Sequence, residues 1–147
     1  MPGKMQLPGL NHVGVIVRNL DDSLRFYESA FGLTPSQRWD VQMDGTFRGQ
    51  PATFSARIAY LQMGTASLEL IEPVGGDSTW AEFLANRGEG MHHIGFYIPD
   101  FEQALAEAAA QGLGLLQMAR FDGGGFAYFD TKRADGVVFE VVQLPGQ

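Results

Sequence analysis

The fold is decided by Met91-His92-His93-Ile94-Gly95-Phe96, which repeats the pattern of Leu10-Asn11-His12-Val13-Gly14-Val15. When His12 is aligned with His93, the residues that follow in each half run as strand, helix and further strands. Side chains in both stretches alternate in character, as expected of a β-strand with two different faces. The sequence therefore predicts two similar halves, each beginning with a histidine on a strand.

Each half also carries a glutamate in a late apolar strand: Glu69 in Leu68-Glu69-Leu70-Ile71-Glu72 and Glu140 in Phe139-Glu140-Val141-Val142-Gln143. A carboxylate among apolar residues is costly to bury unless a partner neutralises it, and no Lys or Arg lies in these strands. One imidazole and one carboxylate from each half could close around a single divalent metal ion. The predicted ligands are His12, Glu69, His93 and Glu140.

The plain alternative is that these side chains have no shared role, because a single strand histidine or glutamate is more often structural or solvent-facing than a ligand. Their matching places in two halves favour the metal site. His92 is expected on the opposite face of its strand from His93, in a structural role. Glu72 ends its strand and is expected at the surface or beside the ligands.

Cap residues and apolar spacing predict helices over about 21–32, 77–88 and 100–112. The clearest β-rich runs are Arg57–Met63, Ala66–Ile71, Phe126–Phe129 and Gly136–Leu144, with weaker candidates at Leu33–Arg38 and Leu113–Arg120. The first half is longer than the second, and the excess falls in Trp39–Phe54. This segment is rich in large apolar residues and in glycine, and is expected to be a loop packed over the site.

Composition fits one compact domain, with 147 residues of which 45% are hydrophobic. The formal net charge of −7 argues against a general nucleic-acid or anionic-membrane surface. There is no cysteine, so disulfides and thiolate metal sites are excluded.

Met1–Pro8 has no apolar signal region and no stretch approaches a membrane span, so a cytoplasmic protein is expected. Cations available for an anionic small molecule, or simply solvated, are Arg48, Arg57, Arg120, Lys132 and Arg133.

From Leu10 to Leu144 the sequence resembles the vicinal oxygen chelate superfamily, in which two βαβββ modules form a curved sheet around a metal. Residues 83–96 resemble the stretch of the methylmalonyl-CoA epimerase branch that precedes and includes its second metal histidine. Residues 68–73 and 135–142 match the two carboxylate strands of the superfamily. The resemblance implies an α+β fold of two tandem βαβββ modules that form a curved mixed sheet around a metal site.

The same resemblance implies a single domain over residues 1–147, with module one at about 8–74, a linker helix at about 77–88 and module two at about 90–145. It also implies one divalent metal ion, either Co, Ni, Zn, Mn or Fe, and a homodimer. Whether one chain supplies every ligand or two chains share each site stays open, since the superfamily does both. The residues that match the ligand positions are His12, Glu69, His93 and Glu140.

Several positions depart from the named members of the superfamily. The epimerases have a catalytic glutamate before the strand that matches Ala59-Tyr60-Leu61, but this chain has no glutamate between Glu28 and Glu69. Thr53 falls near the expected place, and the acids in this interval are Asp40 and Asp44. The epimerase activity therefore does not transfer directly from the resemblance.

Two further positions separate the chain from glyoxalase I, and one separates it from the epimerases. Glyoxalase I holds glutathione with an arginine and an asparagine, where this chain has Ile16 and Pro73. The epimerases often carry glutamine where this chain has Glu69, whereas glyoxalase I carries glutamate there. The true substrate is therefore expected to differ from both familiar ones.

The function that this sequence favours is a metal-dependent isomerase, epimerase or lyase that acts through a metal-stabilised enolate. Glu140 is the expected base and Glu69 its partner. The expected substrate is a small-molecule carbonyl compound or an acyl-CoA, with neither nucleic acid nor membrane as a partner. Two alternatives stay open: a drug-sequestering binding protein, which needs no metal residues, and an extradiol-type dioxygenase, which uses three protein ligands rather than four.

Overall fold

The structure is a computed structural model that describes residues 4–131 and 136–146. Within these residues the chain is mixed α and β, as predicted. In chain order the elements are β1 (His12–Ile16), α1 (Leu20–Phe31), β2 (Gln37–Phe47), β3 (Gln50–Met63), β4 (Ala66–Gly75), α2 (Thr79–Arg87), β5 (Gly90–Tyr97), α3 (Phe101–Ala110), β6 (Gly114–Phe121), β7 (Gly124–Asp130) and β8 (Phe139–Gln143).

The described strands form one closed barrel in the order β1-β4-β3-β2-β6-β7-β8-β5. β1 pairs in parallel with β4, and β5 pairs in parallel with β8. The halves meet where β1 pairs with β5 and where β2 pairs with β6, both antiparallel. The strands of the two halves therefore follow the same order, while the exact module boundaries stay a prediction.

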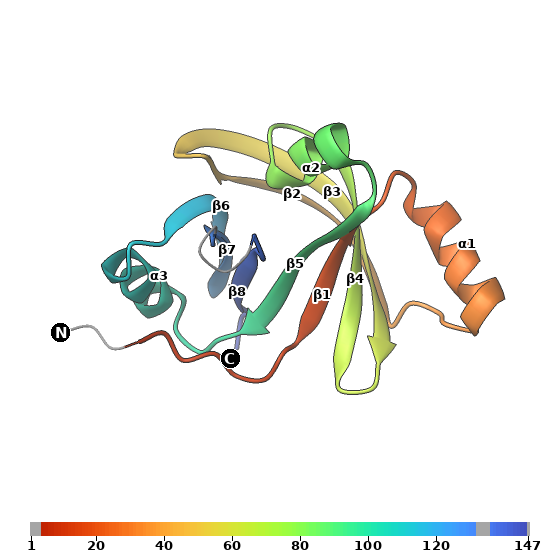
Figure 1. Cartoon of the computed structure of the whole chain (residues 1–147), viewed down its shortest axis with the longest axis horizontal. Coiled ribbons are helices and arrows are strands. Elements are labelled where there is room, and N and C mark those ends of the chain that lie inside the picture. Colours follow the sequence, from red (N-terminus) through yellow and green to blue (C-terminus); the bar gives the residue numbers. More distant parts are fainter. Residues whose placement is uncertain (1–3, 132–135, 147) are drawn as a thin grey trace.

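The three helices described begin at side-chain caps close to the predicted positions. Asn19 accepts a hydrogen bond from the Asp22 N–H at 2.9 Å to start α1, and Ser78 and Asp100 cap α2 and α3 in the same way. α1 ends at Gly32, whose φ of 69° lies in the left-handed region. Figure 1 shows α1 and α3 at opposite ends of the molecule, outside the sheet, with α2 between β5 and the β2–β3 pair.

Successive side chains along each strand point to opposite faces of the sheet. The apolar core therefore has two parts, one inside the barrel and one between its outer faces and the helices. Leu70 faces outward and packs with Leu20 and Leu24 of α1, while Ile71 joins the interior cluster around Trp80. Full burial of a leucine contributes about 1.5–3 kcal/mol, so α1 is held mainly by this apolar contact. Among the described residues no helix is long and apolar enough to cross a membrane.

The prediction of a loop over Trp39–Phe54 is wrong, because this segment forms most of a long β-hairpin. β2 and β3 pair antiparallel along their length, and the chain reverses at Arg48 and Gly49. Their φ angles of 50° and 81° suit a two-residue hairpin turn. Trp39 and the second residue after it, Val41, face the interior cluster, which is the period-two pattern of a strand.

Candidate metal centre

The predicted ligands lie on four strands that are neighbours in the barrel, β4, β1, β5 and β8. Each offers one ligand atom, and these atoms all lie within 4.8 Å of one another. His12 Nε2 is 2.8 Å from Glu140 Oε1 and 3.2 Å from His93 Nε2. His93 Nε2 is 3.2 Å from Glu69 Oε1. The structure therefore brings all four predicted residues together within one chain.

Two glycines allow the imidazoles to approach each other across the β1–β5 pair. Gly14 lies opposite His93, and Gly95 lies opposite His12. A Cβ on Gly14 would lie 1.9 Å from His93 Cε1, and a Cβ on Gly95 would lie 2.0 Å from His12 Cε1. Each half therefore leaves out a side chain where the histidine of the other half must fit.

The residue before each histidine fixes the orientation of its imidazole ring. His12 Nδ1 lies 2.8 Å from Asn11 Oδ1, and His93 Nδ1 lies 2.8 Å from His92 Nδ1. Because Asn11 Oδ1 can only accept, His12 donates from Nδ1, which leaves Nε2 as the atom that faces the cluster and can bind a metal. Partners of this kind hold metal-ligating histidines in the required tautomer.

The prediction that His92 lies on the opposite face from His93 is wrong. The β1–β5 register shifts between Gly14 and Val15, so that His93 faces Gly14 while Met91 faces Val15, and His92 is the extra residue of a β-bulge. Both imidazoles consequently contact the Tyr128 ring, with centroids 5.1 Å and 4.8 Å away. Burial lowers the pKa of His92 to about 3, so His92 is neutral and can accept the His93 Nδ1–H.

The two carboxylates hold protons on the histidines when no cation is bound. Burial by itself would lower the pKa of His93, but the nearby carboxylates of Glu140 and Glu69 raise it to about 9. Burial likewise opposes ionisation of Glu140, yet His93 and His12 lower its pKa to about 2. The cluster therefore attracts positive charge strongly.

The cluster fits a divalent metal ion by two criteria. Its donors are two imidazole nitrogens and two carboxylate oxygens, a mixed set that suits Zn, Co, Ni, Mn or Fe. Glu69 Oε1 is buried and makes no hydrogen bond, although it lies 3.2 Å from His93 Nε2. A buried carboxylate oxygen without a hydrogen bond is costly unless a cation binds it.

A cavity of about 340 Å³ inside the barrel opens onto Glu69 and Glu140. Tyr60 lies across the strand pair from Glu69, and Tyr128 lies across from Glu140. The Tyr60 and Tyr97 hydroxyls are 3.3 Å apart, and burial raises the pKa of both, so both stay neutral. No sequence motif marks these tyrosines, since only strand pairing places them beside the glutamates.

The acids near the position of the epimerase glutamate do not line this cavity. Asp40, Asp44 and Thr53 are exposed, while their strand neighbours Trp39 and Met43 line the cavity instead. Thr53 donates to Asp44 at 2.5 Å on the outside of the hairpin. Among the described residues, the carboxylates at the cavity are Glu69 and Glu140.

The arginines predicted to be available for an anion are engaged elsewhere. Arg48 pairs with Glu82, Arg57 with Glu72 and Arg120 with Glu102. Lys132 and Arg133 lie outside the described residues. Glu72 accepts the Leu20 N–H at 2.7 Å, so it holds the start of α1 rather than the metal.

Sequence comparison finds relatives that include an enzyme. The chain is 29% identical over 140 residues to the uncharacterized protein YqjC of Bacillus subtilis, with 93% of each chain covered. Over 99 residues it is 28% identical to human mitochondrial methylmalonyl-CoA epimerase, covering 67% of this chain and 51% of the human protein. The chain thus spans about half the length of that enzyme.

Solved structures match nearly the whole chain. Methylmalonyl-CoA epimerase from Streptomyces coelicolor, in complex with 2-nitronate-propionyl-CoA, has a TM-score of 0.73 and 25% identity, covering 97% of this chain and 100% of that one. A hypothetical protein from Bacillus halodurans has a TM-score of 0.72 and 27% identity, covering 94% and 95%. These likenesses agree with the resemblance to the epimerase branch. Residues 11–129 match the family pattern, and the chain therefore belongs to the Glyoxalase/Bleomycin resistance protein/Dioxygenase superfamily.

Proposed function

We propose that this protein is a divalent-metal-dependent isomerase or epimerase, or a lyase, that removes a proton next to a substrate carbonyl group. The observation that carries the proposal is the buried cluster of four donors, in which Glu69 Oε1 makes no hydrogen bond. A divalent ion held by these donors would supply Lewis-acid chemistry, which stabilises negative charge on a carbonyl oxygen. The residues that would hold it are His12, Glu69, His93 and Glu140.

The matching pairings of β1 with β4 and of β5 with β8 support two tandem βαβββ modules within one domain. Because the cluster is complete within one chain, a homodimer would not be required to build the site. The homodimer and the cytoplasmic location stay predictions.

The two carboxylates would move the proton. Glu140 is the predicted base, since its lowered pKa keeps it ionised beside the cavity at neutral pH. Glu69 is the alternative base, because its Oε1 accepts no hydrogen bond within the protein. The Tyr60 hydroxyl, neutral and across the strand pair from Glu69, would donate a hydrogen bond to a substrate oxygen.

The relatives support this class of chemistry. Methylmalonyl-CoA epimerase is an isomerase, and the Streptomyces coelicolor enzyme is solved with an acyl-CoA analogue. An acyl-CoA or another carbonyl compound is accordingly the proposed substrate, with proton removal and return as the shared step.

The proposal is tested by metal analysis of protein purified without chelator, followed by exchange of substrate α-protons with deuterium from D2O. We expect about one metal ion per chain and metal-dependent exchange. Glu140→Gln and Glu69→Gln should each be assayed, with loss of roughly 10²–10⁴-fold expected for the base. The matched control is Glu28→Gln, on the exposed side of α1.

A protein with only trace metal that still binds small molecules would instead be a binding protein. Iron-dependent oxygen uptake with catechols would indicate a dioxygenase.

A further inference from the structure

We infer that the site takes an uncharged carbonyl compound bearing an aromatic or similarly flat apolar group, rather than a carboxylate-bearing coenzyme A thioester. The inference rests on the proposed function, because it names the substrate class of the same site. It is carried by the lining of the cavity, by the charge of the site, and by the engagement of the surrounding arginines.

Aromatic rings dominate the wall of the cavity next to the carboxylates. Trp39 packs edge-on against Tyr60 with centroids 5.1 Å apart, and Phe126 packs edge-on against Tyr128 at 5.4 Å. Both pairs line the cavity, together with Phe121 and aliphatic side chains. Faces and edges of this kind suit a flat ring, which gains offset-stacked and edge-to-face contacts.

The net charge of the metal-loaded site does not favour an anionic substrate. A divalent ion, two carboxylates and two neutral imidazoles sum to zero. Among the described residues that line the cavity, none is lysine or arginine, and the polar ones other than tyrosine are Gln37, Glu69 and Glu140. A substrate carboxylate would therefore lie beside two glutamates with no cation other than the metal ion that those glutamates already neutralise, which is unfavourable.

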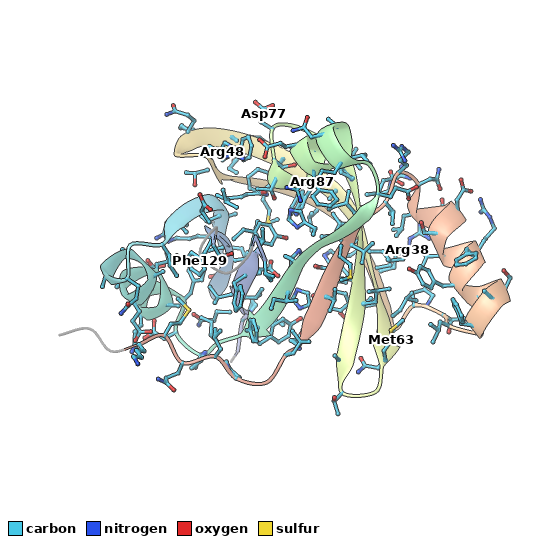
Figure 2. All side chains as sticks on the ribbon, viewed as in Figure 1. Arg38, Arg48, Met63, Asp77, Arg87 and Phe129 are labelled. Carbon is cyan, nitrogen blue, oxygen red and sulfur yellow. The ribbon has the colours of Figure 1, made fainter. Side chains whose placement is uncertain are left out.

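The arginines outside the cavity are also engaged. In the described residues, Arg38 pairs with Asp21 of α1, and Arg48 pairs with Glu82 of α2. Figure 2 labels Arg38, Arg48 and Arg87. Arg18, Arg25, Arg57 and Arg120 likewise lie in ion pairs with carboxylates. Arg87 lies over the Phe83 ring. The phosphates of coenzyme A are bound through charge-assisted hydrogen bonds, and all of these arginines except Arg87 are already paired with carboxylates of the protein.

The size of the cavity agrees with a small ligand. Its volume of about 340 Å³ lies at the lower end of the roughly 300–1,000 Å³ found for ligand pockets. The Tyr60–Tyr97 hydroxyl pair and Gln37 give a few polar contacts within the apolar wall. A few polar groups in an apolar cavity fix orientation while burial of the ring supplies affinity.

The inference is tested by calorimetric titration of the Co²⁺-loaded protein with four probes. 2-Hydroxyacetophenone is neutral and aromatic, hydroxyacetone lacks the ring, 4-(hydroxyacetyl)benzoate adds a carboxylate, and methylmalonyl-CoA represents the charged thioester. We expect 2-hydroxyacetophenone to bind at least about tenfold more tightly than each of the others. Equal or tighter binding of either carboxylate-bearing probe would overturn the inference.

A charge variant gives an independent test. Gln37 is exposed at the start of β2 and lines the cavity, whereas Gln50 is exposed at the start of β3 outside it. Gln37→Arg should raise the affinity for 4-(hydroxyacetyl)benzoate about tenfold, and Gln50→Arg should leave it unchanged. If the two variants bind 4-(hydroxyacetyl)benzoate with the same affinity, the inference that the cavity lacks a cationic side chain is contradicted.

Exchange of α-protons with D2O separates failure of the inference from failure of the proposed function. Preferred binding of 2-hydroxyacetophenone without any exchange would support the substrate class and overturn the proton-transfer chemistry. Exchange of methylmalonyl-CoA with no preference for the aromatic probe would support the chemistry and overturn the substrate class.

Discussion

Gly14 and Gly95 govern how closely the two histidines approach each other, because each lies under the imidazole of the opposite half. Neither has a positive φ, so the need for glycine at these positions is steric rather than conformational. The nearest atoms to an added Cβ belong to a buried imidazole, which has no free space to move into.

Gly95→Ala should displace the His12 ring and weaken metal binding by roughly 10–100-fold, the range seen when groups that orient a ligand are lost. Gly9→Ala is the control, since a Cβ there meets nothing within 4 Å. Dissociation constants from competition with a chromophoric chelator provide the measurement. Similar affinities for the two variants would show that the close approach is not needed.

Metal binding should depend on pH, because the metal-free histidines hold protons that a metal must displace. Since the pKa of His93 is about 9, His93 is protonated at neutral pH, and the neighbouring carboxylates Glu140 and Glu69 also raise the pKa of His12. The apparent affinity should therefore fall as pH falls from 9, by about tenfold per pH unit for each proton released. Titration calorimetry in two buffers of different ionisation enthalpy counts these protons, and a pH-independent affinity would refute the assignment.

The residues of the site were predictable because repetition makes them visible. His12 and His93 occupy equivalent places in two copies of a strand, and Glu69 and Glu140 do so in two others. Tyr60 and Tyr128 were not predictable in the same way. Their position beside the glutamates depends on which strands pair and in what register, which local sequence does not specify.

At the scale of single elements, helices were easier to predict than strands. Asn19, Ser78 and Asp100 cap helices through bonds to nearby residues, so their effect can be read from a few positions. The β2–β3 hairpin was mistaken for a loop because the glycines within Trp39–Phe54 outweighed its alternating apolar residues. The bulge at His92 depends on pairing with β1, so it has no local signal.

The bulge gives a prediction for His92 as a positioning residue. His92→Phe keeps the aromatic contacts with Phe83 and Tyr128 but removes the acceptor for His93 Nδ1–H, so metal affinity should fall roughly 10–100-fold. His92→Gln restores an acceptor and should recover much of the loss. If both variants bind metal equally well, the ring of His93 is held by packing alone.

At the scale of the whole molecule, the proposed site joins both halves, since two of its donors come from each. Metal binding should therefore stabilise the entire barrel rather than one part. At a free metal concentration of about 100 times the dissociation constant, the stabilisation is about 2.7 kcal/mol.

For a chain of this size we expect a rise in melting temperature of about 5–10 °C on metal addition, reversed by EDTA. Thermal unfolding followed by circular dichroism provides the measurement, with Gly95→Ala expected to show a smaller rise at the same metal concentration. A melting temperature unaffected by saturating metal would mean that the ion does not bind the folded barrel in preference to the unfolded chain.

The crossed fit of Gly14 with His93 and of Gly95 with His12 also constrains how this chain can change over evolutionary time. Two copies of a segment ordinarily drift apart, because each is free to accept substitutions of its own. Here a larger residue in one copy would be tolerated only after the other copy had lost its histidine. The two halves are therefore expected to keep or to lose these four positions together.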